Sequence, residues 1–356
     1  IIRCLLQNPK LLIMDEPTSV LTPQEVQTLF ATLRKLKSEG TSILYISHKL
    51  EEIRSLCDTA TILRRGKKVA GCTPSETSAA ALAEMMVGAS FKAPQKKQHE
   101  LGKTRLSVKA LTLAGNDSGK SPISDLSFEI AAGEILGIGG IAGNGQEELL
   151  AALSGEALSA PQMFQLNGEN IGHLGPNARR TLGLLCAPEE RLGHAAAPNM
   201  SLIENALLTG ALRKKLVKNG FLNWSGAEKF AKIIIDEFDV RTPGTANTAA
   251  SLSGGNLQKF VIGREVLQDP DVLVVNQPTW GVDAAAAAAI RQSLLDLAAK
   301  GAAILIISQD LDELIEISDR FCALYEGRLS QIKKTAGLTI EDIGLMMGSA
   351  TAEATP

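Results

Sequence analysis

The sequence has 356 residues, 45% hydrophobic and 21% charged, enough apolar material for one or two cores, which excludes a disordered tail, a collagen-like repeat and a small disulfide scaffold. The 36 basic and 39 acidic residues sum to −3, which excludes a polybasic binder of nucleic acid or membrane surfaces. Five scattered cysteines favour a reducing compartment, and no apolar run reaches the roughly 18 residues of a membrane span.

The first and last parts of the chain match at an offset of 261 residues. Arg3 matches Arg264, Pro17 matches Pro278, and Ser47 matches Ser308. A repeat this long predicts two duplicated domains rather than a solenoid. We expect the second domain at 105–348, a tail at 349–356 and a polar linker at 91–104. Residues 1–90 match only the end of the second domain, so the first would begin roughly 150–160 residues before Ile1.

Strands alternating with helices predict an α/β fold with a parallel sheet. In the first copy the strands are 11–14 and 42–46, with a helix from Pro23 between them. In the second copy we predict strands at 105–113, 123–130, 134–139, 272–275 and 303–307, and helices at 257–267 and 284–299. Residues 198–239 have helical periodicity, with Ser225 and Glu228 as a capping box. The apolar stripe of that region suits core packing or a docking surface.

Two consecutive carboxylates, Asp15 and Glu16, follow the first predicted strand. In a nucleotide-hydrolysing enzyme the first can hold Mg²⁺ through water, and the second can orient or deprotonate the attacking water. A parallel sheet binds its ligands at this end of a strand. An acidic cap of the next helix would give the same pattern. His48, which follows the neighbouring strand, favours the catalytic interpretation because it could contact a γ-phosphate.

A glycine-rich loop in the second copy joins a strand to a helix, as in loops that wrap backbone N–H groups around phosphate. The phosphate-loop pattern then requires Lys and Ser or Thr, but the chain has Gln146 and Glu147. The loop that precedes them contains Gly140, Gly143, Asn144 and Gly145.

At other positions too, the second copy has lost a charged or titratable side chain that the first copy has. Asn276 and Gln277 replace Asp15 and Glu16, and Gln309 replaces His48. An amide cannot act as a general base, which typically contributes about 10²–10⁴ in rate. The second copy is therefore predicted to keep a nucleotide-shaped pocket without competent catalysis.

A serine and two glycines, Ser253, Gly254 and Gly255, precede a predicted helix that contains Gln258. A helix that starts this way offers N–H donors and a positive dipole end to an anion. An ordinary helix cap would give the same sequence.

Together these segments resemble the ATP-binding subunits of ABC transporters. Residues 11–18 resemble a Walker B motif, Ser47-His48 the switch histidine, 140–147 an altered Walker A motif, and 252–258 the signature motif. Two fused domains, the second one altered, resemble importers of simple sugars or nucleosides. The resemblance implies P-loop NTPase domains, each with a RecA-like parallel sheet, an antiparallel β subdomain and a helical insert. Glu189 stands where this family has a glutamine that contacts Mg²⁺.

In this family two domains pair head to tail, and each ATP lies between the Walker motifs of one domain and the signature of the other. The resemblance therefore implies one competent site for ATP and Mg²⁺. Glu16 and His48 would be catalytic, Asp15 would hold Mg²⁺ through water, and the other domain would contribute Ser253, Gly254, Gly255 and Gln258. A second, altered site would contain Gly140, Gly143, Asn144, Gly145, Gln146, Glu147, Glu189, Asn276, Gln277 and Gln309. The fragment alone would be nearly inactive, because the first phosphate loop lies outside it.

The implied partners are membrane permease subunits and, indirectly, an extracytoplasmic solute-binding protein. The expected location is the cytoplasmic face of the cell membrane, as a peripheral subunit without nucleic-acid partners. Two alternatives stay open: a soluble ABC ATPase that acts on ribosomes or nucleic acid, and a non-catalytic nucleotide-sensing module. A short linker and a slightly acidic chain disfavour the first. The second would bind ATP without turnover even at full length.

Overall fold

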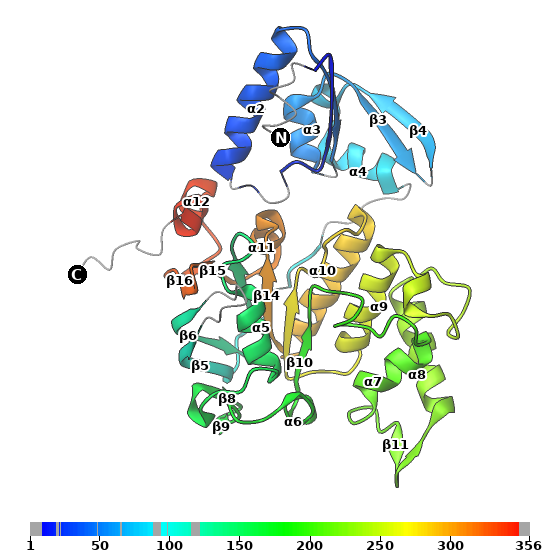
Figure 1. Cartoon of the computed structure of the whole chain (residues 1–356), viewed down its shortest axis with the longest axis vertical. Coiled ribbons are helices and arrows are strands. Elements are labelled where there is room, and N and C mark those ends of the chain that lie inside the picture. The colour runs from blue at the N-terminus through cyan, green and yellow to red at the C-terminus, as the bar shows by residue number, and fades with distance from the viewer. Residues whose placement is uncertain are drawn as a thin grey trace, which may run out of the picture. The chain divides into compact units, whose positions relative to one another are not determined.

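The computed structural model describes residues 9–18, 21, 23–47, 49–64, 66–87, 94–97, 99–114 and 122–348. The chain divides into two compact units. Unit 1 consists of Ile1–Ala93 with Asp283–Ala285, and unit 2 of Pro94–Val282 with Ala286–Pro356. Figure 1 labels the helices and strands of each unit.

Unit 1 contains a two-stranded parallel sheet, β1 (Leu11–Asp15) and β2 (Ser42–Ile46), connected by helix α2 (Pro23–Ser38). Alternate residues of β1 are buried, since Leu12 and Met14 pack against Leu29 and Leu33 of α2. The chain continues through α3 (Leu50–Leu56), an antiparallel pair of β3 (Ala60–Arg64) and β4 (Lys67–Cys72), a 3₁₀ turn (Pro74–Glu76) and α4 (Ala79–Val87).

The opposite face of the β1–β2 sheet is apolar but exposed. Leu11, Ile13, Leu44 and Ile46 are each between 46% and 60% exposed. An exposed cluster of large apolar side chains on adjacent strands is typical of a surface that another segment or molecule covers.

Unit 2 is built on a parallel sheet with strand order β10, β13, β14, β7, β15, to which β16 (Arg328–Leu329) and β17 (Lys333–Lys334) add antiparallel pairings at the β15 edge. The parallel strands are β10 (Leu184–Ala187), β13 (Val272–Asn276), β14 (Ala303–Ser308), β7 (Ile135–Gly139) and β15 (Arg320–Tyr325). Parallel sheets are covered on both faces, which explains why β13 and β14 are apolar almost throughout. The predicted α/β class is confirmed.

Successive residues of β13 enter two different cores. Leu273 and Val275 pack with helices on one face, whereas Val272 and Val274 pack with an antiparallel sheet and one helix on the other. The first face is covered by α9 (Gly254–Val266), α10 (Ala284–Ala299), α11 (Leu311–Ile317) and α12 (Ile340–Gly348). The second is covered by α5 (Gln146–Ser154) and the sheet of β6 (Ile123–Ala131), β5 (Thr104–Leu113), β8 (Phe164–Leu166) and β9 (Glu169–Asn170).

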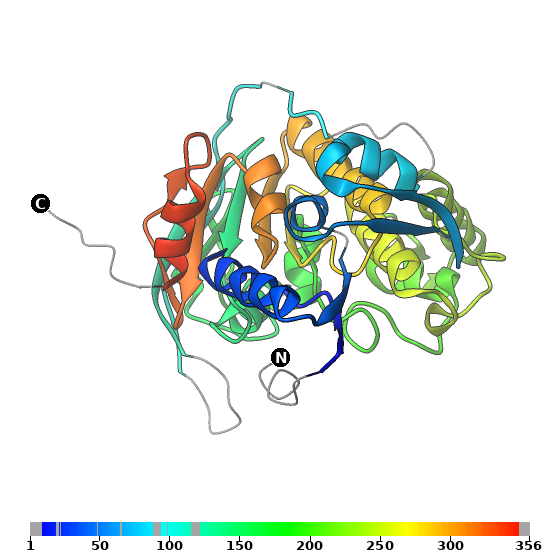
Figure 2. The same ribbon diagram turned by 90° about the horizontal axis from the view of Figure 1, so that it is seen from above.

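A helical insert of unit 2 packs through its own apolar cluster. Helices α7 (Leu202–Gly210) and α8 (Trp224–Glu237) pack with the middle of α9 around Phe230 and Phe260. In both views of unit 2, the antiparallel strands in teal and these helices in yellow-green lie on opposite sides of the parallel sheet (Figures 1 and 2). Another short helix, α6 (Pro176–Leu182), precedes β10.

Two predictions for the insert are wrong. A hairpin of β11 (Val217–Lys218) and β12 (Phe221–Leu222) interrupts the predicted helical region, because Asn219 and Gly220 both have positive φ and form a tight turn. The residue that caps α8 is Asn223, whose side chain accepts from the N–H of Gly226 at 2.9 Å, rather than Ser225. A complete capping box is present instead at Ser201 and Glu204 of α7.

Candidate functional site

The carboxyl end of the β1–β2 sheet carries the predicted catalytic carboxylates. Asp15 ends β1 and is exposed, as is Glu16, which has the left-handed φ of 41°. The N–H of Glu16 donates to the carbonyl of Ile46 at 2.8 Å, which fixes the turn to the end of β2. Ser47 follows directly, whereas His48 lies outside the described residues. Asp15 and Glu16 thus lie at the carboxyl ends of parallel strands, the place where such sheets usually bind ligands.

Glu52 of α3, which no sequence motif singles out, bonds to residues at this edge. Its carboxylate accepts from the hydroxyls of Thr18 at 2.7 Å, Tyr45 at 2.6 Å and Ser47 at 3.3 Å. Burial and the hydrogen bond to Glu52 raise the pKa of Tyr45 above its usual value. Glu52 could have been found by the repeat, because it matches Glu313 at the same offset of 261 residues.

In unit 2 the glycine-rich loop leads from β7 into α5 with the expected shape. Gly140, Gly143 and Gly145 have φ of 157°, 87° and 111°. A Cβ on Gly140 would lie 2.5 Å from the carbonyl oxygen of Leu324. The backbone of Leu324 therefore leaves no room for a side chain at position 140.

Side chains of this loop satisfy the loop itself. Gln146, 9% exposed, donates its amide to the carbonyl of Ile141 at 2.9 Å and accepts from the N–H of Asn144 at 3.0 Å. Asn144 in turn donates to Ile141 at 2.8 Å and accepts from the N–H of Glu326 at 2.9 Å. The backbone N–H of Asn144, a donor that could otherwise bind a phosphate, is therefore already hydrogen-bonded within the protein.

Two carboxylates lie near each other beside this loop. Burial, and then the charge of Glu147, raise the pKa of Glu189 above its usual value, while Arg191 acts in the opposite direction. The guanidinium of Arg191 donates to the carbonyl of Trp280. Glu147 in the first turn of α5 and Glu189 in the loop after β10 make this position less favourable for a polyphosphate than the lysine and hydroxyl of the usual pattern.

The amides that replace the acidic pair lie at the carboxyl ends of β13 and β14. Gln277, with φ of 53°, donates its N–H to Ile307 at 2.8 Å and receives contacts from Ser308 Oγ and Gln309 N, both at 3.4 Å. Asn276 is 2% exposed, and in the described part of the chain its Oδ1 has no hydrogen-bond partner. The structure therefore brings the Gln277 side chain and the backbone N–H of Gln309 together, and their place in an altered nucleotide site stays a prediction.

The serine and glycines predicted to meet an anion begin α9, three residues earlier than the predicted helix start. Ser253 is the N-cap residue and Gly254 the first helical residue, and both are exposed. The Ser253 hydroxyl accepts from the amide of Asn256 at 2.9 Å, and it does not cap the helix backbone. Gln258 is 1% exposed and donates to the carbonyls of Gln277 and Pro278 at 3.2 and 2.9 Å, so its side chain stabilises unit 2 internally.

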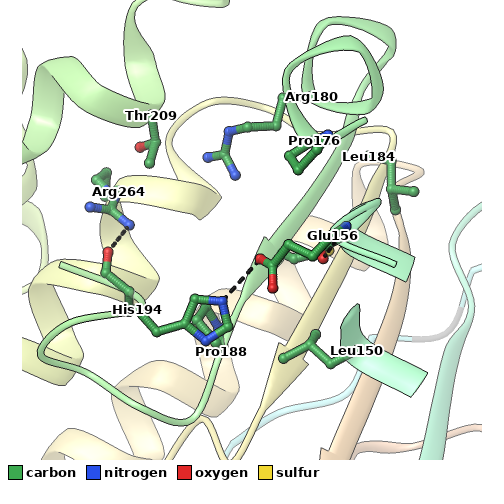
Figure 3. A pocket seen from close by; sticks show the side chains of 12 residues that line it. Leu150, Glu156, Pro176, Arg180, Leu184, Pro188, His194, Thr209 and Arg264 are labelled. Carbon is green, nitrogen blue, oxygen red and sulfur yellow. Dashed lines mark hydrogen bonds and ion pairs between the residues drawn. The ribbon is translucent and has the colours of Figure 1, made fainter. Parts of the chain in front are cut away.

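A cavity of about 110 Å³ lies between the helical insert and the sheet of unit 2. Figure 3 shows Arg180 and Arg264 on one side and the pair of Glu156 and His194, 2.9 Å apart, on another. Arg180 and Arg264 both pair with the fully buried Glu265. In the described residues no helix is long and apolar enough to cross a membrane, and no group of three or more His, Cys, Asp or Glu residues is arranged to hold a metal ion.

Comparison with known proteins gives consistent matches. A family model described as ABC transporter matches residues 123–280. The glucose import ATP-binding protein TsgD13 of Haloferax volcanii is 36% identical over 99% of this chain and 65% of its own length. The nucleoside import ATP-binding protein NupA of Lactococcus lactis is 35% identical, with 98% and 69% covered. The galactose/methyl galactoside import ATP-binding protein MglA of Escherichia coli is 37% identical, with 94% and 66% covered.

Solved structures give the same fold. The chain resembles an ATP-binding subunit of an ABC transporter with a TM-score of 0.54 at 21% identity, over 68% of this chain and 98% of that one. It resembles a nucleotide-free ATP-binding cassette with a TM-score of 0.54 at 19% identity, over 68% and 94%.

Proposed function

This chain belongs to the family of ABC transporter ATP-binding proteins, and we propose that it is part of the ATP-hydrolysing subunit that powers an importer of simple sugars or nucleosides. The import proteins for glucose, nucleosides and galactose to which it is similar support this class of cargo. The observation that carries the proposal is the asymmetry between the halves. Asp15 and Glu16 stand at the sheet edge of unit 1, and Asn276 and Gln277 stand at the matching edge of unit 2.

The chain spans about two thirds of the length of these relatives, from 65% to 69%. We propose that a segment resembling residues 105–170 covers the exposed face of β1 and β2 in the full-length protein. The residues that match Leu11, Ile13, Leu44 and Ile46 in unit 2 are at most 2% exposed and pack against α5 and the antiparallel sheet. A segment of this kind would also bring a phosphate loop to Asp15 and Glu16.

The proposed competent site combines Asp15, Glu16 and His48 with Ser253, Gly254 and Gly255 in a head-to-tail pairing of ABC domains. Glu16 would accept the proton of the attacking water. The exposed Ser253 hydroxyl and the start of α9 would face the triphosphate, because a helix N-terminus stabilises negative charge.

Asp15 suits Mg²⁺ as a single exposed carboxylate at a strand end. Mg²⁺ is commonly bound by one or two carboxylates, water and substrate phosphates rather than by a cage of protein ligands. When bound, the ion would neutralise charge on the phosphates.

The altered site is proposed to be non-catalytic. Gln146 holds the loop closed on itself, Glu147 and Glu189 add negative charge, and Gln277 cannot act as a general base. Unit 2 would then serve its partner half by supplying Ser253, Gly254 and Gly255.

The proposed partners are permease subunits, which would place the protein at the cytoplasmic face of the membrane. The helical insert is the proposed docking region. The cavity between the insert and the sheet is lined by both charges and apolar side chains (Figure 3). A solute-binding protein would act indirectly, through the permease.

The test is ATP hydrolysis by the full-length protein with its permease. Glu16→Gln is expected to abolish turnover, and Gln277→Glu is expected to change it little. Robust turnover by the Glu16→Gln variant would refute the proposed site. Tight ATP binding without any turnover by the unaltered protein would favour a nucleotide-sensing module instead.

A further inference from the structure

One carboxylate of unit 1 connects the two loops that carry the predicted catalytic residues. Glu52 accepts from Thr18, two residues after Glu16, and from Ser47, which directly precedes His48. Thr18 is only 2% exposed, and the Glu52 side chain is 11% exposed. These buried hydrogen bonds fix the ends of β1 and β2 to the first turn of α3.

Two further groups restrict the Glu52 carboxylate. The Tyr45 hydroxyl donates to Oε2 at 2.6 Å, and Lys49 Nζ lies 3.7 Å from Oε1. The ring of Tyr45 is itself held edge-on against Phe30 of α2, with centroids 6.3 Å apart. A hydrogen bond to a charged acceptor contributes more than one between neutral groups, so this carboxylate is well held.

Unit 2 retains the same carboxylate, and the partners that match Thr18 and Ser47, Thr279 and Ser308, are retained with it, whereas the others differ. Glu313 accepts from the hydroxyl of Ser308 at 2.9 Å, as Glu52 accepts from Ser47. The positions that match Tyr45 and Lys49 are Ile306 and Asp310, which cannot donate through their side chains at neutral pH. Arg291, at the position of Phe30, lies 3.5 Å from Glu313 instead.

We propose that Glu52 is a positioning residue for ATP hydrolysis, which holds the loops of Glu16 and His48 in the relative place that the reaction requires. This inference rests on the proposed function, because it assumes that Glu16 is the general base. Glu313 has the same place in a half that lacks the catalytic side chains. The Tyr45–Lys49 set around Glu52 is present only in the half that keeps Asp15 and Glu16.

The test compares Glu52→Gln with its matched control Glu313→Gln in the full-length protein with its permease and MgATP. Glu52→Gln keeps the side-chain volume but removes the charge and replaces one acceptor oxygen by a donor. We expect kcat to fall about 10- to 100-fold, since small misplacements of catalytic groups have effects of this size. The KM for ATP should change less than about threefold, because Glu52 is not proposed to touch the nucleotide. Glu313→Gln should leave kcat per folded protein within about twofold, as it acts only in the altered half.

Tyr45→Phe provides a milder variant if Glu52→Gln does not fold. It removes one hydroxyl from the carboxylate and keeps the ring contact with Phe30, and we expect kcat to fall about 3- to 10-fold. Tyr45→Phe combined with Glu52→Gln should lower kcat by less than the product of the two single effects, since both weaken the same contact between Tyr45 and position 52.

Two results would overturn the inference. One is an unchanged kcat per folded protein in Glu52→Gln, even with a lowered melting temperature, because that shows a purely structural role. The other is a raised KM with unchanged kcat, which shows a role in ATP binding. Glu16→Gln distinguishes the two levels of argument. If Glu16→Gln retains turnover, the proposed site fails, whereas if it abolishes turnover and Glu52→Gln does not lower kcat, only the positioning role fails.

Discussion

The loop after β7 is held in shape by Gln146, so Gln146→Ala is predicted to destabilise unit 2. The side chain is 9% exposed, with hydrogen bonds of 2.9 Å to Ile141 O and 3.0 Å to Asn144 N. Each buried hydrogen bond contributes about 1 kcal/mol, and a buried N–H left without a partner costs about 1–3 kcal/mol. We therefore expect the free energy of unfolding to fall by roughly 2–3 kcal/mol.

Tryptophan fluorescence measures this change in unit 2 alone. The chain has two tryptophans, Trp224 and Trp280, and both lie in unit 2. For a unit of this size 1 kcal/mol corresponds to about 2–4 °C, so the thermal midpoint should fall by roughly 5–10 °C. Gln162→Ala is the matched control, because Gln162 is exposed in a 3₁₀ turn, and it should cost less than about 0.5 kcal/mol.

The same measurement tests whether the closed loop excludes nucleotide. Millimolar MgATP is expected to leave the midpoint of the unaltered chain unchanged, because the Asn144 N–H already has an acceptor and Glu147 and Glu189 repel phosphate. A ligand at 100 times its Kd would add about 2.7 kcal/mol, or at least about 5 °C. A shift of that size, or a Gln146→Ala variant as stable as Gln162→Ala, would contradict the description of the loop as closed on itself.

Three further predictions concern the stability of unit 2. Burial raises the pKa of Glu313 from 4.5 to about 7, so the folded state keeps a proton that the unfolded state loses, and stability falls as pH rises through this range. For the unaltered chain, the free energy of unfolding measured with urea should be lower at pH 8 than at pH 5, by at most about 3 kcal/mol. The Glu313→Gln variant should not show this difference. Ser201→Ala should lower the free energy of unfolding by about 1 kcal/mol at neutral pH. The effect should be smaller below pH 4.5, because the Ser201 hydrogen bonds lower the pKa of Glu204 and are weakened when Glu204 is protonated. Unfolding curves at acid and neutral pH would show the difference. Gly327→Ala should cost about 3 kcal/mol or more in thermal unfolding, because its Cβ would lie 1.7 Å from Pro122 O at a φ of 72°. Gly168→Ala, at a φ of 88° with open space around it, should cost only about 1 kcal/mol.

The parallel sheet could be predicted from sequence because strands buried on both faces must be apolar at every position. Residues 272–275 and 303–307 meet this requirement, and β13 and β14 lie there. The insert was harder to predict, because helices of period 3.6 flank the hairpin on both sides. The one sequence signal for the hairpin is the dipeptide Asn219-Gly220, which stands between two segments of helical periodicity.

The contacts of Glu52 could not be predicted from local pattern. Thr18 lies 34 residues earlier in the chain, and a glutamate in the first turn of a helix already has a sufficient explanation in the helix dipole. Gln258 was assigned to ATP because of its place in the motif, but burial decides its use. At 1% exposure the donors of its amide NH₂ group must find acceptors inside the fold, and the carbonyls after β13 supply them.

The two halves have the same backbone geometry at the proposed catalytic position but different side chains. Glu16 and Gln277 have φ of 41° and 53°, and each donates its N–H to the neighbouring strand at 2.8 Å. The backbone geometry at the proposed general base, Glu16, is therefore also present at Gln277, and only the functional group differs. We therefore expect Gln277→Glu to place a carboxylate at the matching position without producing hydrolysis, because Gln146 still bonds within the glycine-rich loop and Asn276 still stands where unit 1 has Asp15, the proposed Mg²⁺ ligand. The loss of catalysis proposed for unit 2 is spread over several positions, so reversal of any single one should give no measurable second site.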